Sequence, residues 1–385
     1  MPLNKEYDYI IAGGGCAGLS LVMRLLKEPP LSTKKILIID KDRKKLNDRT
    51  WCYWEKGEGF FEEIVYRKWD KAWFHGEGYS SLKELGPYEY KMIRGIDFYR
   101  HCHELISAYP NVEICLGELK SIQHTDKGVE AIVGDEAYQA QYVFSSILLT
   151  QPPLGEDQYN LLQHFKGWVI ETEEPIFQSN EATLMDFRVT QEEGTTFVYV
   201  MPLSSTRALV EYTLFTQTTL SDDQYDEGLR RYIQDYLQTN DYRIVEEEFG
   251  VIPMTDLSFP EVQGNVIYIG TAGGQTKPSS GYTFRFIQKK ADLIITRLLL
   301  GMHPHSPVKT IEKRFKWFDQ VLLHMLARKK MTGKKIFSLL FSRNKISTIF
   351  AFLDNETSIQ QEMRIMNTLP QLPFMQAGWF ELFKK

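Results

Sequence analysis

The order of predicted strands and helices indicates an α/β fold, with a β-rich domain inserted into it and a helical part at the C-terminal end. Three observations predict this fold. A short apolar strand, a glycine-rich turn, a helix and a second strand follow one another near the N-terminus. A further strand, glycine-rich turn and helix occur after residue 265. Between these two segments lie short apolar and alternating stretches that are typical of β-strands.

The composition is typical of a globular protein, because 43% of the residues are hydrophobic and 25% are charged. The four cysteines show no C-x-x-C spacing, which predicts free thiols in a reducing compartment and argues against a metal site. The first residues enter an apolar strand without a charged and apolar leader, so we expect a cytoplasmic protein. No apolar run reaches about 18 residues, so we expect no membrane-spanning helix.

Residues 9 to 40 have the pattern of a Rossmann-like dinucleotide-binding unit. The apolar strand 9–12 leads into the turn Gly13-Gly14-Gly15-Cys16-Ala17-Gly18, which satisfies G-x-G-x-x-G. Aliphatic residues at helical spacing follow, which predicts a helix. A second apolar strand, 36–39, then ends at Asp40. Strand, glycines, helix, strand and terminal acid therefore occur in the order that a dinucleotide site requires.

Each residue type in this unit has a physical role. Gly13 permits the tight turn, Gly15 lets backbone N–H groups approach a pyrophosphate, and Gly18 allows the helix to lie close to the strand. The helix N-terminus supplies partial positive charge to the phosphates. Asp40, 22 residues after Gly18, would accept hydrogen bonds from an unphosphorylated ribose. We therefore predict a dinucleotide site, for NAD or FAD, that consists of Gly13, Gly15, Cys16, Ala17, Gly18 and Asp40.

The order of elements also predicts the domain boundaries. Residues 86–106 read as strand, loop and helix, which places Arg94 either beside the dinucleotide or on the surface. We expect a discontinuous dinucleotide-binding domain made of residues 5–60, 90–150 and 255–300, a substrate domain made of residues 61–89 and 151–254, and a helical C-terminal region made of residues 301–385.

Glu211 is the most unusual residue of the β-rich part. Residues 197–215 read as two strands joined by a polar turn, and Glu211 shares a face of the second strand with Leu209, Thr213 and Phe215. A carboxylate among apolar groups must find partners, or its pKa rises and it keeps its proton near neutral pH. Glu211 is then a usable acid. The alternative is an edge strand from which Glu211 reaches solvent.

The second glycine-rich segment distinguishes FAD from NAD. A strand at 266–269, a glycine-rich turn, a proline-marked loop and a helix from near Gly281 resemble the second flavin-contacting segment of hydroxylase-like and reductase-like FAD proteins. The resemblance implies that FAD contacts also come from Gly273, Gly274, Gly281 and Tyr282. The dipole of the helix would stabilise negative charge on a reduced flavin. That superfamily usually has an aspartate in the turn, where this chain has Thr271-Ala272-Gly273-Gly274.

Six motifs in fixed order resemble those of lycopene β-cyclases of the bacterial type. They are "NDRTWCYWE" (47–55), "LLQHFKGWVIE" (161–171), "LMDFR" (184–188), "YVMPLSSTRALVEYT" (199–213), "GVIPM" (250–254) and "GTAGGQTKPSSGYTF" (270–284). The resemblance implies an FAD-dependent enzyme that converts lycopene, through γ-carotene, to β-carotene without net redox change. It also implies that FAD acts in its reduced form, with NADPH or NADH as the electron source.

The implied chemistry gives Glu211 a role. Cyclisation protonates C2 of the terminal double bond, forms a cation at C1 that captures the C5–C6 double bond, and ends with loss of the C6 proton. In the family an acidic motif, "LEE" in plant enzymes, occupies this strand and reads "VEY" here. The resemblance therefore implies a catalytic role for Glu211 alone, with Tyr212 in place of the second acid.

Other residues in the family motifs are weaker candidates. Further catalytic acids are Asp48, which could instead form an ion pair with Arg49, and Asp186, which could do so with Arg188. His164 is expected to be a core or surface residue. The aromatic residues of "DRTWCYWE" could stabilise the cation through their ring faces, or could simply pack in the core. Candidate substrate-tunnel residues are therefore Trp51, Tyr53, Trp54 and Arg188.

Residues 305–347 form a basic segment within a chain whose net charge is −5. Eleven basic and two acidic residues give this segment a charge of +9, and its apolar residues recur at helical spacing. This pattern suits attachment to an anionic membrane surface, so we expect peripheral association with the inner face of the membrane. Nucleic-acid binding is less favoured because no nucleic-acid motif is present. A solvated basic face on ordinary core helices is the remaining alternative.

Two other functions share the predicted fold. A redox flavoenzyme, such as a monooxygenase or a prenyl-chain reductase, would consume NAD(P)H and O₂ or saturate its product. A non-catalytic carotenoid-binding protein would leave lycopene unchanged. Glu211 within the cyclase motifs favours cyclisation over both.

Overall fold

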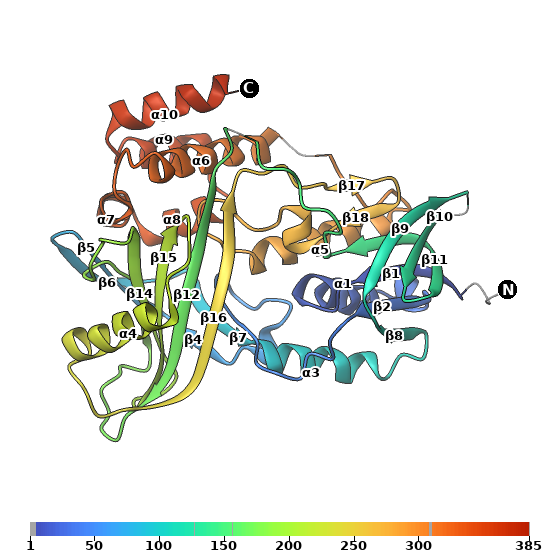
Figure 1. Ribbon diagram of the computed structural model, residues 1–385, viewed down its shortest axis with the longest axis horizontal. Helices are drawn as coiled ribbons and strands as arrows, with labels where there is room; N and C mark the ends of the chain where they lie inside the picture. The colour runs from blue at the N-terminus through green and yellow to red at the C-terminus, as the bar shows by residue number, and fades with distance from the viewer. Residues whose placement is uncertain (1–4, 127, 156, 308–309, 385) are drawn as a thin grey trace.

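The computed structural model describes residues 5–126, 128–155, 157–307 and 310–384. In Figure 1 one sheet lies at the right, near the N-terminus, and long strands of a second sheet cross the centre and left. The last helices of the chain stack at the upper left. The predicted α/β fold, with a β-rich part between the two glycine-rich segments and helices at the C-terminal end, is confirmed.

The N-terminal sheet contains both strands of the predicted dinucleotide unit. Strands β18, β11, β1, β2 and β8 run parallel in that order, which places the ends of β1, β2 and β18 at one edge. Strands β9 and β10 extend it antiparallel from β11, and β17 pairs with β18. The bounds are β1 Lys5–Ala12, β2 Ile36–Asp40, β8 Val112–Leu116, β9 Leu119–Thr125, β10 Gly128–Val133, β11 Glu136–Ser145, β17 Val262–Gln263 and β18 Val266–Tyr268.

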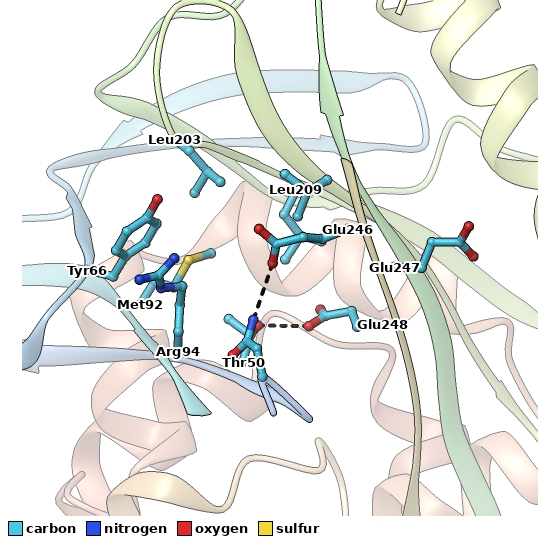
Figure 2. Close-up of a pocket in the computed structure, with 11 residues that line it drawn as sticks. Thr50, Tyr66, Met92, Arg94, Leu203, Leu209, Glu246, Glu247 and Glu248 are labelled. Carbon is cyan, nitrogen blue, oxygen red and sulfur yellow. Dashed lines mark hydrogen bonds between the residues drawn. The ribbon is translucent and has the colours of Figure 1, made fainter. Parts of the chain in front are cut away.

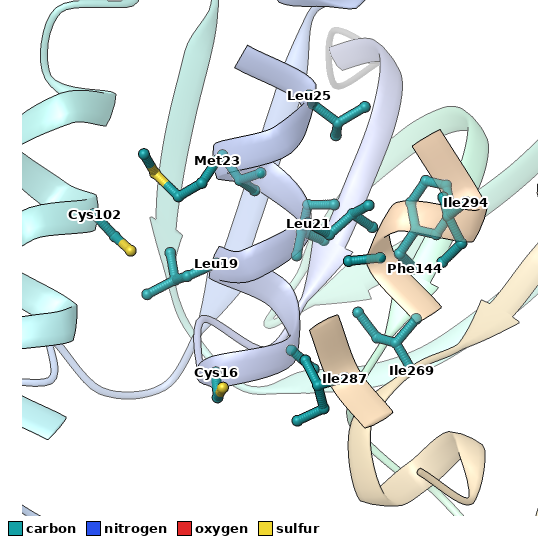
Figure 3. Close-up of a cluster of buried hydrophobic side chains, with 14 of the residues drawn as sticks. Cys16, Leu19, Leu21, Met23, Leu25, Cys102, Phe144, Ile269, Ile287 and Ile294 are labelled. Atoms are coloured by element: carbon teal, nitrogen blue, oxygen red, sulfur yellow. The ribbon is translucent and has the colours of Figure 1, made fainter. Parts of the chain in front are cut away.

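Helix α1 (Cys16–Lys27) packs between two helices that come from distant parts of the chain (Figure 3). These are α3 (Gly95–Ile106) and α5 (Phe284–Leu299). Aliphatic side chains of α1 and α5 form one buried cluster with the sheet. The buried Arg24 ties the helices further, because its guanidinium donates to Asp292 at 2.6 Å and to Gln288 at 2.8 Å. The two glycine-rich turns are therefore held at a fixed distance. A short helix, α2 (Pro29–Ser32), follows α1.

The second sheet has the strand order β16-β12-β15-β14-β13-β5-β6. Neighbours run antiparallel except β13 and β5. Helix α4 (Asp222–Tyr236) packs on one face, against Val210 and Tyr212, whereas Leu209 and Phe215 pack on the other face with the C-terminal helices. The bounds are β5 Lys71–Gly76, β6 Tyr79–Glu84, β12 Asn160–Glu171, β13 Glu181–Asp186, β14 Thr195–Pro202, β15 Arg207–Thr216 and β16 Arg243–Thr255.

A small sheet, of order β3-β7-β4, joins the two larger ones. Its strands are β3 Thr50–Lys56, β4 Arg67–Trp69 and β7 Tyr88–Arg94, and a 3₁₀ turn, η1, spans Glu62–Ile64. A second 3₁₀ turn, η2, follows β18 at Gly270–Gly273. The C-terminal helices are α6 Thr310–Ala327, α7 Gly333–Arg343, α8 Ile346–Leu353, α9 Ile359–Met366 and α10 Gln371–Phe383.

The helix after the second glycine-rich turn starts later than predicted. Helix α5 begins at Phe284 and not near Gly281. Gly281 has a φ of +70°, and a loop closed by hydrogen bonds from Gly281 N to Lys277 O and from Lys277 N to Tyr282 O precedes the helix. A left-handed residue interrupts helical geometry, so the loop passes through Gly281 before the helix starts.

The apolar residues of the basic segment pack in the protein core. Side chains of α6, α7 and α8, including Leu323, Met325 and Phe341, are buried in the clusters beneath the second sheet and between the C-terminal helices. They are therefore not available to enter a bilayer. Lys309, one of the basic residues, lies outside the described residues. Among the described helices, none has both the length and the hydropathy that a membrane span requires.

The contact of α1 with β1 gives a stability prediction for Gly18→Ala. An added Cβ would lie 2.0 Å from the carbonyl oxygen of Gly13 and 2.9 Å from Ile11, so helix and strand would have to separate. We expect a loss of about 1–3 kcal/mol in the free energy of unfolding, measured by urea denaturation. The control is Gly15→Ala, whose Cβ meets no described atom within 4 Å. Equal stability of the two variants would contradict the prediction.

Candidate active site

A cavity of about 580 Å³ lies where the N-terminal sheet, the small sheet and the second sheet meet. It is lined by both glycine-rich segments, by the start of β3, by one face of β14 and β15, and by the middle of β16. The lining segments are residues 15–17, 48–52, 248–253, 270–271 and 280–284, with Tyr199, Met201, Leu209 and Glu211 from the sheet. Segments more than 200 residues apart in the sequence thus share one site.

The N-terminal glycine-rich turn forms an open cradle at one end of the cavity. Gly13 has a φ of +101°, a left-handed conformation that favours glycine. Gly15 is the N-cap of α1, and a Cβ added there would meet no described atom within 4 Å. Asp40 accepts hydrogen bonds from the backbone N–H of Gly14 at 2.7 Å and of Asp42 at 2.8 Å, which hold its carboxylate beside the turn. Space, helix N-terminus and carboxylate fit the pyrophosphate and ribose of a dinucleotide.

The second glycine-rich segment borders the same cavity. Gly281 and Tyr282 line it, whereas Gly273 and Gly274 lie outside the lining residues and shape the turn behind it. A Cβ at Gly273 would lie 2.3 Å from the carbonyl oxygen of Tyr268. The buried side-chain oxygen of Gln163 has no hydrogen-bond partner among the described residues and lines the cavity here. An unpaired buried acceptor fits a ligand that donates a hydrogen bond, as a flavin ring can.

Two glutamates lie side by side in the wall of this cavity. Strand β12 lies between β15 and β16, and its residue Gly167 pairs with Glu211 on one side and with Glu248 on the other. Both glutamates therefore project from the same face of the sheet. Thr213 Oγ1 donates to Glu211 Oε1 at 2.9 Å, and Thr50 Oγ1 donates to Glu248 Oε2 at 2.8 Å. The fold thus brings together two carboxyl groups that are 37 residues apart in the sequence.

The pair has an electrostatic consequence. Burial raises the pKa of Glu211 well above its usual range, and the neighbouring charge of Glu248 raises it further, against the hydrogen bond from Thr213. Burial also raises the pKa of Glu248, while the hydrogen bond from Thr50 opposes that rise. Two adjacent carboxylates cannot both ionise easily in a site of this kind. The pair therefore holds a proton near neutral pH, with Glu211 as its preferred carrier.

Aromatic residues form much of the remaining wall. Trp51, Tyr90, Tyr199 and Tyr282 line the cavity. Burial raises the pKa of Tyr282 to about 12 and that of Tyr199 well above its usual range, so these phenols stay neutral. Ring faces and neutral phenols suit a cationic, apolar substrate better than a charged wall would.

Two predicted tunnel residues lie behind this wall, in the core. Tyr53 stacks on Phe284 at 4.4 Å, and Trp54 stacks on Phe350 at 4.5 Å. Both are almost fully buried and lie outside the residues that line the cavity. Of the predicted aromatic set, Trp51 is the member that borders the cavity.

The other predicted acids lie in different surroundings. Asp48 borders the cavity and forms an ion pair with Arg49 at 3.3 Å. Asp186, on β13, is fully buried outside the lining residues, where it accepts hydrogen bonds from Arg188 Nε at 2.9 Å and from Tyr232 at 2.8 Å. Arg188 is therefore held by that ion pair, away from the lining residues.

Arg94 and His164 also lie outside this cavity. Arg94 pairs with Asp97 at 2.6 Å. His164 is a buried core residue, between Thr216 and Tyr225, as expected.

A smaller cavity of about 200 Å³ (Figure 2) shares part of its wall with the main one. Arg94, Tyr66 and Glu246 border it, and it shares three lining residues, Thr50, Leu209 and Glu248, with the main cavity. Glu248 and Thr50 were not predicted from the sequence. The available signal for Glu248 was its position two residues before the start of the motif "GVIPM", from which Phe249 separates it.

Comparison with known proteins identifies the family. Residues 8–378 match the family described as "Lycopene cyclase protein". The lycopene beta-cyclase of Pantoea ananas is 23% identical over 343 residues, which are 85% of this chain and 84% of that protein. The enzyme of the same name from Pseudescherichia vulneris is 31% identical over 129 residues, 31% of this chain, and that of Paracoccus sp. (strain N81106 / MBIC 01143) is 26% identical over 227 residues, 55% of this chain. These two matches span 32% and 57% of the relatives' own lengths.

Solved structures share the fold at low sequence identity. A geranylgeranyl bacteriochlorophyll reductase-like protein from Thermoplasma acidophilum has a TM-score of 0.67 at 13% identity, with 97% of this chain and 98% of that chain covered. A p-nitrophenol 4-monooxygenase from Pseudomonas putida DLL-E4 has a TM-score of 0.58 at 13% identity, with 98% and 97% covered. The fold is that of FAD-dependent reductases and monooxygenases, and the match over residues 8–378 shows that the chain belongs to the lycopene cyclase family.

Proposed function

We propose that this enzyme converts both ψ ends of lycopene to β-rings, through γ-carotene to β-carotene, with reduced FAD as its cofactor. The observation that carries the proposal is the pair Glu211 and Glu248, which faces an aromatic-lined cavity bordered by both glycine-rich segments. A redox-neutral cyclisation needs a proton donor in an apolar site, and burial keeps the proton on this pair.

The proposed reaction uses the Glu211 carboxyl group as the acid. It donates its proton to C2, and the electron pair of the terminal double bond forms the new C–H bond, which leaves a cation at C1. The C5–C6 double bond then supplies the C1–C6 bond, and loss of the C6 proton forms the ring double bond. Return of one proton to Glu211 restores the starting state, so atoms and electrons balance. The face of Trp51 is positioned to stabilise the cation.

The proposed FAD site uses the two glycine-rich segments. Gly13, Gly15, Cys16, Ala17 and Gly18 would hold the pyrophosphate, and Asp40 the ribose. The loop before α5, with Gly281 and Tyr282, would border the flavin, and Gly273 and Gly274 shape the turn behind it. Reduced FAD, when bound, supplies negative charge that stabilises the substrate cation; NADPH or NADH is the proposed source of its electrons. Asp48 remains a candidate acid because it borders the cavity, whereas the ion pair of Asp186 supports a structural role.

A redox reaction on a prenyl chain is the second candidate. The fold shared with a geranylgeranyl bacteriochlorophyll reductase-like protein supports it. The two functions differ in stoichiometry, because a reductase consumes one reductant for each bond it saturates. Under anaerobic conditions a cyclase keeps its flavin reduced through many turnovers, and a reductase oxidises it once per product.

We also propose that the enzyme associates with the inner face of the membrane through α9 and α10, where its lipophilic substrate is accessible. Helix α10 exposes side chains spaced three or four residues apart, while Ala377, Gly378 and Glu381 on its other side are buried. The basic residues of α6 to α8 would add attraction to anionic lipids. The exposed apolar residues of these two helices are Ile359, Met363, Leu372, Met375, Trp379, Phe380, Leu382 and Phe383.

Replacing the proposed acid tests the cyclase function. Glu211→Gln keeps the volume of the side chain but removes the transferable proton, so we expect the cyclisation rate to fall about 10²–10⁴-fold while FAD stays bound. Lycopene should accumulate when the variant is expressed in a lycopene-producing bacterium, as measured by pigment chromatography.

The matched control is Tyr212→Phe, because Tyr212 packs beneath α4 on the opposite face of the same strand. It should cyclise lycopene at nearly the wild-type rate. Near wild-type activity in Glu211→Gln would instead show that another group provides the proton.

Replacing Asp40 tests the FAD site. Asp40→Ala removes the carboxylate beside the glycine-rich turn that would accept hydrogen bonds from the ribose of FAD. Because hydrogen bonds to a charged group contribute more to binding free energy than neutral ones, we expect FAD affinity to fall about 10- to 100-fold. Flavin fluorescence titration of apoprotein measures this change. Asp42→Ala, at an exposed carboxylate two residues away, is the control. Unchanged affinity in Asp40→Ala would contradict the proposed site.

Replacing Trp379 tests the membrane surface. We expect Trp379→Ser to weaken co-sedimentation with anionic vesicles about tenfold. The substitution removes the apolar surface of the indole ring, which membrane binding would otherwise transfer out of water. The control is Leu300→Ser, since Leu300 and Trp379 are both 68% exposed but Leu300 lies at the end of α5. Binding should weaken, without vanishing, as salt rises. Equal loss in both variants would contradict a specific role for α10.

A further inference from the structure

We propose that Glu248 is a proton relay between Glu211 and solvent, that the smaller cavity is the solvent side of this relay, and that Gly167 makes the relay possible. The inference rests on the proposed function, because it concerns how the acid regains its proton. Three observations support it: the register of β15, β12 and β16, the space left by Gly167, and the position of Glu248 in the walls of both cavities.

The register places the two carboxyl groups on either side of a glycine. Neighbouring strands lie about 4.8 Å apart, so Glu211 and Glu248, on the two outer strands, have backbones roughly 10 Å apart. Side chains can cross that gap only over the middle strand. A Cβ at Gly167 would lie 3.0 Å from Glu248 Cγ and 3.0 Å from Leu209 Cδ1, closer than ordinary contact. The missing side chain therefore leaves the space in which Glu248 reaches toward Glu211.

Glu248 belongs to the walls of both cavities. Thr50 belongs to both as well, and its hydroxyl donates to Glu248 Oε2 at 2.8 Å (Figure 2). This hydrogen bond holds one carboxyl oxygen toward β3, and the other oxygen remains for Glu211. Glu248 is thus placed to accept a proton on one side and to release it on the other.

The smaller cavity is polar and reaches the surface. The side chains of Glu246 and Glu247 are 40% and 56% exposed, and Arg207 donates to Glu246 at 2.7 Å. Arg94 and Asn47 also border it. Water therefore has access to this side of Glu248. Around Glu211 the wall includes Trp51, Tyr199 and Leu209, and an apolar substrate bound against these side chains would exclude water from this side of the pair.

The reaction explains why a relay is useful. Each ring takes up a proton at C2 and releases one at C6, and two rings form on each lycopene. Without exchange, the proton released by one ring would pass to the next. With exchange through Glu248, each new ring takes its proton from solvent. The carboxyl groups of Glu211 and Glu248 are hydrogen-bonded to each other, so a proton can pass directly between them.

The test follows deuterium during cyclisation in D₂O. Holoenzyme with reduced FAD is given lycopene in vesicles, and mass spectrometry measures deuterium at C2 of the β-rings. Wild-type enzyme should label every ring. In Glu248→Gln we expect the rate to fall about tenfold or more and most rings to keep hydrogen, because Glu211 recycles the proton from C6. Loss of rate with full labelling would show a merely structural role and overturn the relay.

Two further variants separate the relay from general damage. Gly167→Ala changes neither glutamate, but its added Cβ displaces the side chain of Glu248, so it should lower labelling as Glu248→Gln does. Full labelling in this variant would contradict the role of Gly167. The control is Glu171→Gln, because Glu171 is a half-buried residue of β12 that pairs with Arg243 and borders neither cavity; this variant should label every ring. If wild-type holoenzyme left lycopene unchanged, the proposed function itself would fail, and the relay with it.

Discussion

The close approach of two half-buried carboxyl groups over Gly167 is the constraint on which the rest of this site depends. An unpaired charge in an apolar cavity is costly, and two such charges are costlier still, so the pair keeps a proton. The two carboxyl groups can approach each other only where three adjacent strands are in register and the middle strand has a residue without a side chain. The long strands β12, β15 and β16 provide this arrangement, because their pairing extends well beyond Gly167 on both sides.

The fold then brings this acidic pair to the dinucleotide end of the molecule. The small sheet contributes Thr50 and Trp51 from β3, which joins the two larger sheets at the cavity. The packing of α1 against α5 holds both glycine-rich turns on the opposite side. Neither helix carries an acidic residue in its first turn, so both positive helix ends face the cavity without a competing charge. An acid that keeps its proton and a site for an anionic cofactor are thereby placed on opposite walls.

The surface of the C-terminal helices divides charge and apolar area between different elements. Helices α6 to α8 use their apolar residues for the core and leave basic residues outside, whereas α10 exposes a continuous apolar stripe. A buried cluster of Tyr159, His324 and Glu381 attaches α10 to α6, with Tyr159 bonded to His324 at 2.8 Å. The orientation of that stripe is therefore set by buried polar contacts on the other side of α10.

The sequence by itself determined the α/β fold with its two glycine-rich turns and indicated Glu211 as a candidate acid, because these signals are local. Glycine spacing, strand alternation and a carboxylate among apolar residues can be read within short segments. It also placed Trp51 and Asp48 in a family motif, and both border the cavity. Only the tertiary structure decided which residue stands beside Glu211. Because side chains alternate along a strand, Tyr212 points to the other face of β15 and packs beneath α4. The second carboxyl group comes from Glu248, because β12 pairs with both β15 and β16. Strand register between distant segments depends on the packing of the whole sheet, which no local pattern encodes.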